Sequence, residues 1–405
     1  MTQKEFSNEE QKRIDAINLY LDGEKPSDIC KQIKRSRKWF YKWRKRFQSE
    51  KDGWYEERSK KPRVIANKTK PDIESKIVMI RKELMSGEKE GYEYSCVGVL
   101  AIQHKFSELN YSENQIPKAS VIKRVIRENK LRVRKKKRYK RVKSKQRYRK
   151  IIPTKINELY YFDFKGPLYL RGNNKPIYGA CLKDAISQEV VVDISTTKSM
   201  DYVLSFFIEL FKKRDIPKYL QMDNATSFIG NWRHKRFASR FIRFLLHIGV
   251  EPIFVAPRKP WMNGGIEEFV KLFSEKFWVK KEFGSKEDVK KESKKFENNH
   301  NKLQKWKLRN KNVEIIQSQK LNKNFHFNPK NIEVTASKIH FIREVKNNGK
   351  IRALNEEIMI GKGYSNERVW VTIDVVEQTL RAFHKAKRAE KFKEVKTMKY
   401  KMKNL

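Results

Sequence analysis

Three acidic residues stand where a carboxylate is unusual. Asp163 lies among aromatic residues in YYFDFKG, Asp223 follows an apolar run in LQMDNATSF, and Glu267 opens an amphipathic helix in NGGIEEF. A charge inside a strand is costly unless something compensates it. Carboxylates gathered at one sheet edge repel one another, and hard divalent cations such as Mg²⁺ or Mn²⁺ resolve that repulsion. Two such ions can clamp the attacking and leaving oxygens of a phosphodiester. The alternative is that each acid pairs with a nearby Lys or Arg.

The elements of segment 153–285 would bring these acids together. Three β-rich runs, NELYYFDFKG, PIYGACLKDA and QEVVVDIST, precede helical and strand patterns that complete the order βββαβαβα, with a long helix expected over 231–249. This alternation implies an α/β sheet with helices on its faces. Asp223 follows the fourth strand, where ligands of open α/β sheets gather. Asp184 is expected to be an exposed acid in the turn between the second and third strands.

These segments and their order resemble the ribonuclease-H-like catalytic core of the retroviral-integrase superfamily. More narrowly, they resemble bacterial insertion-sequence transposases with a D,D,E triad, and the run from Pro260 to Glu267 is the most specific match. The resemblance implies a catalytic and metal-binding triad of Asp163, Asp223 and Glu267, with two Mg²⁺ or Mn²⁺ ions per active site. The spacing between the last two acids exceeds what is common in the family, so the adjacent Glu268 stays an alternative.

Basic residues around the third acid are candidates for DNA contact. Arg258 and Lys259 belong to the same matching motif, APRKPWMNGGIEEF. Lys271 lies one helical turn beyond Glu267 on the same face. It would either touch DNA beside the metals or pair with Glu267.

The charge of the whole chain points to a polyanionic partner. Its 405 residues include 94 Lys and Arg against 48 Asp and Glu, a net charge of +46. Nucleic acid is the first candidate and an anionic membrane surface the second. The membrane is disfavoured because no apolar run approaches the ~20 residues that a span needs. The first residues also lack the features of a secretory signal.

The cysteines bear on the compartment. Only Cys30, Cys96 and Cys181 occur, far apart and odd in number. They build neither a disulfide framework nor a zinc spacing, which favours a reducing, cytoplasmic and nucleoid-associated location.

Residues 1–62 show the pattern of a helix-turn-helix domain. Ser36 can cap a last helix, SRKWFYKWRKRF, whose aromatic residues cluster on one side. The opposite side carries the residues expected to contact DNA: Arg37, Lys38, Tyr41 and Lys45. A basic last helix suits the major groove. The alternative is a helical hairpin with a solvated charged face.

A second helical domain is expected over 70–131. Ile122, Val125 and Ile126 would face inward in its last helix, and Lys123, Arg124 and Arg127 would face outward toward DNA. The two domains together are similar to the tandem helix-turn-helix region of the same transposases. The basic linker 132–152 would lie along a phosphate backbone, or alternatively act as a self-repelling connector.

The remaining segments have weaker signals. Residues 286–334 are expected to form a helical linker. Residues 335–384 contain short strands with Gly at the turns, which favour a small β-barrel like that of the transposases. Residues 385–405 are expected to form a basic helical tail.

The leading hypothesis is a DNA transposase. It would bind terminal inverted repeats, cleave the 3′ ends, and join the freed 3′-OH groups to target DNA as a dimer or larger homo-oligomer. The alternatives are a retired transposase that acts as a DNA-binding regulator, and a ribonuclease-H-like nuclease. No membrane partner and no small-molecule substrate are expected.

Overall fold

The computed structural model describes residues 6–50, 52–58, 69–133, 148–230, 234–330, 332–386 and 389–404. The chain divides into two compact units, residues 1–68 and 69–405. Most of the predicted basic linker, 134–147, lies outside the described residues.

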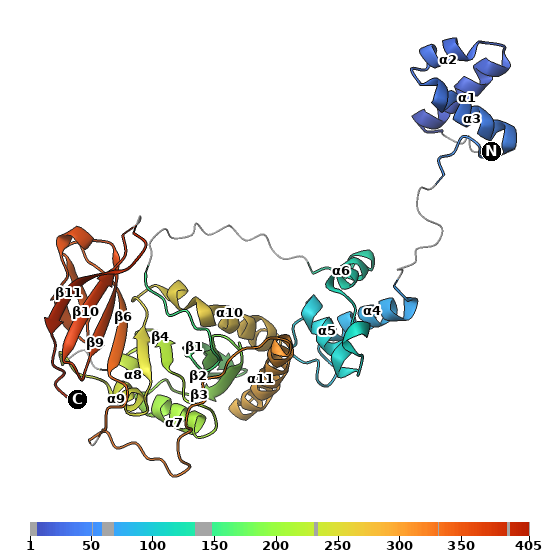
Figure 1. Cartoon of the computed structure of the whole chain (residues 1–405). Coiled ribbons are helices and arrows are strands. Elements are labelled where there is room, and N and C mark those ends of the chain that lie inside the picture. The colour runs from blue at the N-terminus through green and yellow to red at the C-terminus, as the bar shows by residue number, and fades with distance from the viewer. Residues whose placement is uncertain are drawn as a thin grey trace. The chain divides into compact units, whose positions relative to one another are not determined.

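The first unit contains three helices (Figure 1): α1 (Asn8–Leu21), α2 (Pro26–Gln32) and α3 (Arg37–Ser49). The Ser36 hydroxyl accepts a hydrogen bond from the backbone N–H of Trp39 at 3.2 Å, so the predicted cap of α3 is confirmed. Phe40 and Trp43 are buried and pack against α1 and α2. The opposite side of α3 is left to the basic residues.

A helical bundle opens the second unit. It consists of α4 (Pro71–Ser86), α5 (Val99–Glu108), a single 3₁₀ turn (Glu113–Gln115) and α6 (Ala119–Glu128). Ile122, Val125 and Ile126 are buried, as the sequence predicts. Leu303 and Trp306 of the long helix α11 (Lys286–Leu308) join the same apolar cluster. The bundle therefore packs against α11.

A nine-stranded sheet forms the body of the second unit, in the order β11-β10-β9-β6-β5-β4-β1-β2-β3. Its first five strands are β1 (Leu159–Leu170), β2 (Asn173–Asp184), β3 (Val190–Ser195), β4 (Tyr219–Met222) and β5 (Glu251–Phe254). The first three are antiparallel neighbours, while β4 and β5 run parallel to β1. The predicted order βββαβαβα is confirmed here.

Helices cover both faces of this part of the sheet (Figure 1). They are α7 (Met200–Phe211), α8 (Thr226–Ile229), α9 (Arg240–His247) and α10 (Gly264–Phe273), which continues as a π-helical turn (Ser274–Trp278). Helices α7 and α9 pack on one face, and α10 and α11 pack on the other. The helix expected over 231–249 is shorter than predicted, because α9 begins only at Arg240, capped by Ser239.

The C-terminal strands extend the same sheet, so the prediction of a separate small barrel over 335–384 is wrong. They are β6 (Lys338–Glu344), β9 (Arg368–Asp374), β10 (Thr379–His384) and β11 (Lys393–Lys399), with β7 (Lys350–Ala353) and β8 (Glu356–Met359) as a separate ribbon. Strand β6 pairs parallel to β5, and β11 forms where a basic helical tail was expected. Phe341, Val371 and Leu380 join the apolar layer under α7 and α9, which explains why these strands remain in one sheet.

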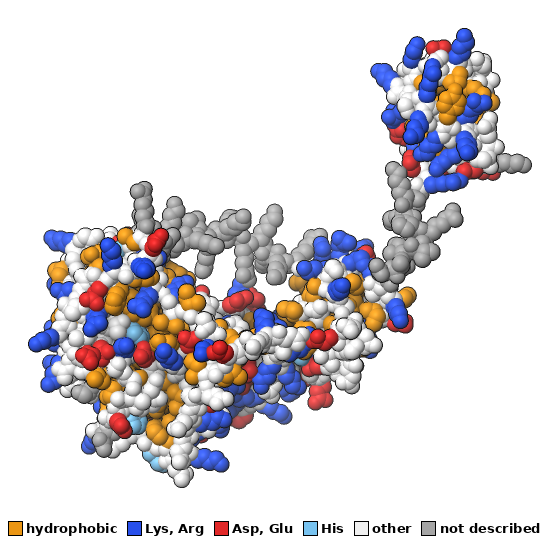
Figure 2. All heavy atoms as spheres, in the orientation of Figure 1, with side chains coloured by type: hydrophobic (Ala, Val, Ile, Leu, Met, Phe, Trp, Pro, Cys, Tyr) orange, Lys and Arg blue, Asp and Glu red, His pale blue; other side chains and the backbone are white. Residues whose placement is uncertain are grey.

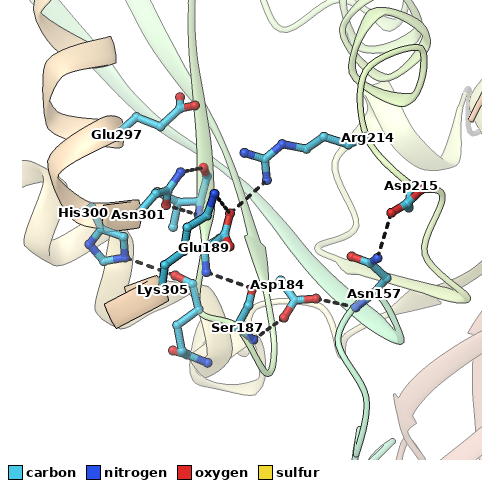
Figure 3. A network of polar contacts seen from close by, with 12 residues as sticks. Asn157, Asp184, Ser187, Glu189, Arg214, Asp215, Glu297, His300, Asn301 and Lys305 are labelled. Atoms are coloured by element: carbon cyan, nitrogen blue, oxygen red, sulfur yellow. Dashed lines mark hydrogen bonds and ion pairs between the residues drawn. The ribbon is translucent and has the colours of Figure 1, made fainter. Parts of the chain in front are cut away.

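Asp184 is buried, so the prediction of an exposed acid is wrong. Its carboxylate accepts hydrogen bonds from the backbone N–H groups of Asn157 at 2.9 Å, Ile186 at 2.8 Å and Ser187 (Figure 3). These bonds compensate the buried charge. Asp184 thus holds the β2–β3 turn against the chain entering β1.

Side chains of α11 pair with the free edge of β3. Asn301 accepts from Val190 N–H at 2.8 Å and donates to Val190 O at 2.9 Å. Glu297 accepts from Val192 N–H at 2.9 Å, and Lys294 donates to Val192 O at 2.9 Å. Figure 3 shows Glu297 and Asn301 projecting from the helix toward the strand. These contacts satisfy backbone groups that an open sheet edge would leave unpaired.

We predict that Asn301→Ala lowers the free energy of unfolding by about 1–3 kcal/mol, because it leaves a buried donor and acceptor unsatisfied. Lys305→Ala is the matched control on the same helix. Its ammonium lies 3.9 Å from Glu189 in an exposed pair, so its loss should cost under about 1 kcal/mol. Urea unfolding would measure both, and equal effects would contradict this account of the edge.

Candidate active site

Strand register places two of the predicted acids side by side. Strand β1 pairs in parallel with β4, and Tyr161 stands opposite Gln221. Asp163 lies two residues further along β1, and Asp223 directly follows Met222, the last residue of β4. Since alternate residues share a face, both carboxylates lie on the face that α10 covers, at the edge where β4 ends. This is the strand end at which the sequence predicts a site, and the role of these residues stays a prediction.

The two carboxylates sit in an environment that opposes their charge. Asp163 accepts one hydrogen bond from Phe164 N–H at 2.8 Å, and Asp223 accepts one from Ala225 N–H at 3.0 Å. Burial and the charge of Asp223 raise the pKa of Asp163 to about 7, and burial also raises the pKa of Asp223. In the described part of the chain, no Lys or Arg forms an ion pair with either. Lys198 lowers both pKa values through its charge alone.

The start of α10 approaches the same site closely. The Asn263 side chain is buried and donates to Phe162 O of β1 at 3.2 Å. Lys183 of β2 donates to Gly265 O at 2.8 Å. A Cβ on Gly265 would lie 2.4 Å from the ring of Tyr161, a distance that real side chains do not reach. The Asn-Gly-Gly sequence therefore lets the helix begin directly on β1.

This approach distinguishes the two neighbouring glutamates. Glu267 is half-buried and close enough to Asp163 for its charge to raise the pKa of that carboxyl. Glu268 is exposed, and its charge acts instead on Lys183, where it opposes the lowering of the lysine pKa by burial. The geometry favours Glu267 as the third acid of the cluster.

A cleft of about 350 Å³ opens at the two aspartates. Arg258 and Lys259, which follow β5, line its wall. Arg258 is exposed, whereas Lys259 pairs with Glu344 at 3.4 Å. The cleft thus places cations beside the acids without neutralising them.

The spacing and the chemistry of the acids bear differently on whether they could hold a metal ion. Among the described residues, no group of three or more His, Cys, Asp or Glu side chains is close enough to hold a metal ion. The donor chemistry nevertheless fits a hard cation, because the set consists of carboxylate oxygens with raised pKa values. Lys271 pairs with Glu275 at 3.4 Å, and no ion pair with Glu267 is seen in the described residues.

The residues predicted to contact DNA are mostly accessible. Arg37, Lys38, Tyr41 and Lys45 are all exposed along α3, and Figure 2 shows basic side chains crowded over the first unit. In the second unit, Lys123 and Arg127 are exposed on α6. Arg124 differs, because it pairs with Glu74 of α4 and with Glu128 at 2.8 Å. Its guanidinium is engaged within the bundle.

Several residues of the site were missed by the sequence analysis. They are Lys183, Lys198, Asn224, Asn263, Gly265 and Arg343. The paired glycines before the third acid were a usable signal of close approach. Asn263 belongs to the same Asn-Gly-Gly sequence. Lys183, Lys198, Asn224 and Arg343 come from separate strands and loops, and no local pattern distinguishes them from ordinary polar residues.

Comparison with known proteins gives a family for the first unit only. Residues 7–54 match the model of a homeodomain-like domain, so this unit is a helix-turn-helix domain. The search of curated proteins found no significant match. No helix among the described residues has the length and apolar character that a membrane crossing needs.

Similar solved structures are retroviral integrases. The catalytic core domain of HTLV-2 integrase in complex with magnesium is 13% identical, covering 40% of this chain and 93% of that chain with a TM-score of 0.24. The BIV integrase core is 12% identical, with coverages of 40% and 90% and a TM-score of 0.25. A simian T-cell lymphotropic virus intasome is 12% identical, with coverages of 74% and 91% and a TM-score of 0.29.

We predict opposite effects from two adjacent glycine substitutions. Gly265→Ala should lower the free energy of unfolding by about 1–3 kcal/mol, because the new methyl group would push α10 away from Tyr161. Gly264→Ala meets nothing within 4 Å and should be neutral or stabilising by up to about 1 kcal/mol. Urea unfolding of both variants measures this, and a shift of the same sign and size would contradict the packing described.

Proposed function

We propose that the chain is a DNA transposase or integrase that cleaves and joins phosphodiester bonds with the help of divalent cations. The observation that carries the proposal is that Asp163 of β1 and Asp223, which directly follows the neighbouring parallel strand β4, line one cleft, with Glu267 near enough for its charge to raise the pKa of Asp163. Uncompensated acids in a protein of net charge +46 are hard to explain as structural ion pairs. The helix-turn-helix unit supplies a way to bind DNA.

Asp163, Asp223 and Glu267 would hold two Mg²⁺ or Mn²⁺ ions. When bound, such ions activate the attacking oxygen and stabilise the charge of the leaving oxygen. The protein's own share is to bury carboxylates near one another, so that a bound cation would favour their charged forms. Burial raises the pKa of both aspartates, and the charges of Asp223 and Glu267 add to this at Asp163.

Other residues would position the DNA strand. Arg258 is exposed at the cleft and Lys198 is exposed before α7, so both can contact phosphate oxygens beside the acids. Lys259 would have to exchange Glu344 for phosphate. The outward faces of α3 and α6 would bind the element end away from the site of chemistry.

The reaction proposed is two successive in-line attacks. Water would first cleave the 3′ end of the element, and the freed 3′-OH would then attack target DNA. The protein forms no covalent bond to DNA in either step, and its residues bind, orient and exclude competing water. Because two element ends must be joined together, we propose a homo-oligomer, a dimer or larger.

We predict that Asp163→Asn and Asp223→Asn abolish both cleavage and joining of a labelled element end in Mg²⁺, while end binding stays within about twofold. Glu267→Gln should share this loss, whereas Glu268→Gln should retain activity as its matched control. The measurement is a strand-transfer gel alongside a binding titration. Full activity of either aspartate variant would contradict the proposed triad.

The same assay separates the alternative functions. Cleavage without joining would favour a nuclease. Binding without either step in the unaltered protein would favour a regulator that has lost its chemistry.

We also predict a difference between the two ends of α3. Arg37 stands at the N-terminal end, which meets base edges in helix-turn-helix docking, and a bidentate contact to guanine contributes about 1–3 kcal/mol of discrimination. Arg37→Ala should therefore weaken binding to the element end more than to a scrambled duplex. Lys45→Ala, near the other end of the helix, should weaken both equally. Titrations at one fixed salt concentration measure this, and equal losses for Arg37→Ala would mean that α3 contacts only the backbone.

A further inference from the structure

Arg343 of β6 is buried at the catalytic edge of the sheet. Its Nε donates to Arg352 O at 2.7 Å, and its Nη1 donates to Ile342 O at 2.9 Å and to Val255 O at 3.2 Å. Its Nη2 donates to the side-chain oxygen of Asn224 at 2.9 Å. The guanidinium thus connects the β7–β8 ribbon, the end of β5 and the loop after β4.

This arginine lacks an acidic partner in the described part of the chain. Its contacts are carbonyl and amide oxygens, and its guanidinium lies 4.7 Å from the ring of Phe341. Burial lowers its pKa to about 9. A buried cation without a counterion costs stability that an apolar residue of similar size would not. A core-filling role alone does not explain a guanidinium at this position.

The contact to Asn224 bears directly on the site. Asn224 follows Asp223 in sequence, and its amide donates in turn to Val255 O. Val255 N–H donates to Met222 O at 3.1 Å, which ties the ends of β4 and β5 together. Within the described ranges, Asp223 itself makes only a local bond, to Ala225 N–H. The loop that carries Asp223 is therefore held from one side by Asn224 and Arg343.

We propose that Arg343 is a positioning residue for Asp223, acting through Asn224, so that the C-terminal extension of the sheet is part of the catalytic site. The role of Asp223 in this inference rests on the proposed function. The planar fork of Arg343 fixes three segments at once, which a single-point ammonium cannot do. The β7–β8 ribbon takes part because Arg352 O accepts one of the four bonds.

The test compares Arg343→Lys, Arg343→Met and Asn224→Ala in the full chain. The matched control is Arg81→Lys, which changes another buried arginine that donates to a carbonyl, Leu131 O at 3.1 Å, in the helical bundle. The first readout is the rate of hydrogen–deuterium exchange at the backbone amides of residues 222–229, measured without metal. We expect faster exchange there in all three site variants and no change there in the control.

The second readout is the apparent affinity for Mn²⁺, measured from the shift in melting temperature that the ion produces. We expect the apparent Mn²⁺ affinity to fall about 10–100-fold in the site variants, as is typical when a residue supporting a metal ligand is lost. Strand transfer should fall in parallel while element-end binding is retained. The double variant Arg343→Lys with Asn224→Ala should be no worse than the more impaired single variant, because both changes break the same bond between Arg343 and Asn224.

The outcomes separate the two proposals. Unchanged loop exchange in the Arg343 variants would overturn the positioning role, whatever their activity. Faster exchange with no Mn²⁺ binding by the unaltered protein would uphold the positioning of this loop and contradict the proposed function. If Arg343→Met fails to fold, Arg343→Lys and Asn224→Ala still decide the result.

Discussion

The structure depends on placing two carboxylates next to each other on adjacent parallel strands. Asp163 lies within β1 and Asp223 directly follows β4, each two residues beyond the Tyr161–Gln221 pair, so this register brings their charges near each other. Burial strengthens their repulsion, because charges interact more strongly in a medium of low dielectric. The surrounding protein does not relieve it with an ion pair among the described residues, and each of the two carboxylates accepts one backbone N–H hydrogen bond, whereas Asp184 accepts three. The buried charge of Asp184 is therefore better compensated than that of Asp163 or Asp223.

The remaining features hold this edge in place. Gly265 and Asn263 let α10 begin on β1, so that Glu267 approaches from above the strands. Helix α11 completes the opposite end of the sheet by pairing its side chains with β3. Strand β6 adds Arg343 beside the loop of Asp223. Contacts from both ends of the sheet therefore limit how far the repelling acids can move apart.

Much of the core was predictable because its signals are local. Alternating apolar residues indicated the strands, and an acid among aromatics in YYFDFKG indicated the site. The partner of β6 was not predictable, because a short strand with Gly turns fits a small barrel and an extended sheet equally well. What decides the outcome is the apolar layer shared with α7 and α9, a property of tertiary packing. Asp184 was misjudged partly for the same reason: Ile186 and Ser187 are local donors to its carboxylate, but the third donor, Asn157, comes from the chain before β1.

The lysines and arginines near the cleft are arranged so that none of those described forms an ion pair with the two aspartates. A net charge of +46 would neutralise a cluster of acids if lysines and arginines were placed at random around it. Instead, no Lys or Arg among the described residues forms an ion pair with the aspartates: Arg258 lines the cleft but is exposed, Lys259 pairs with Glu344, and Lys198 acts through its charge alone. Arg343 approaches the loop most closely, yet it donates to the amide of Asn224 and not to the carboxylate of Asp223. Positive charge therefore lies near the cleft, where it can attract a polyanion, without forming an ion pair with the aspartates among the described residues. Under the proposed function, a divalent cation would relieve the repulsion between the acids.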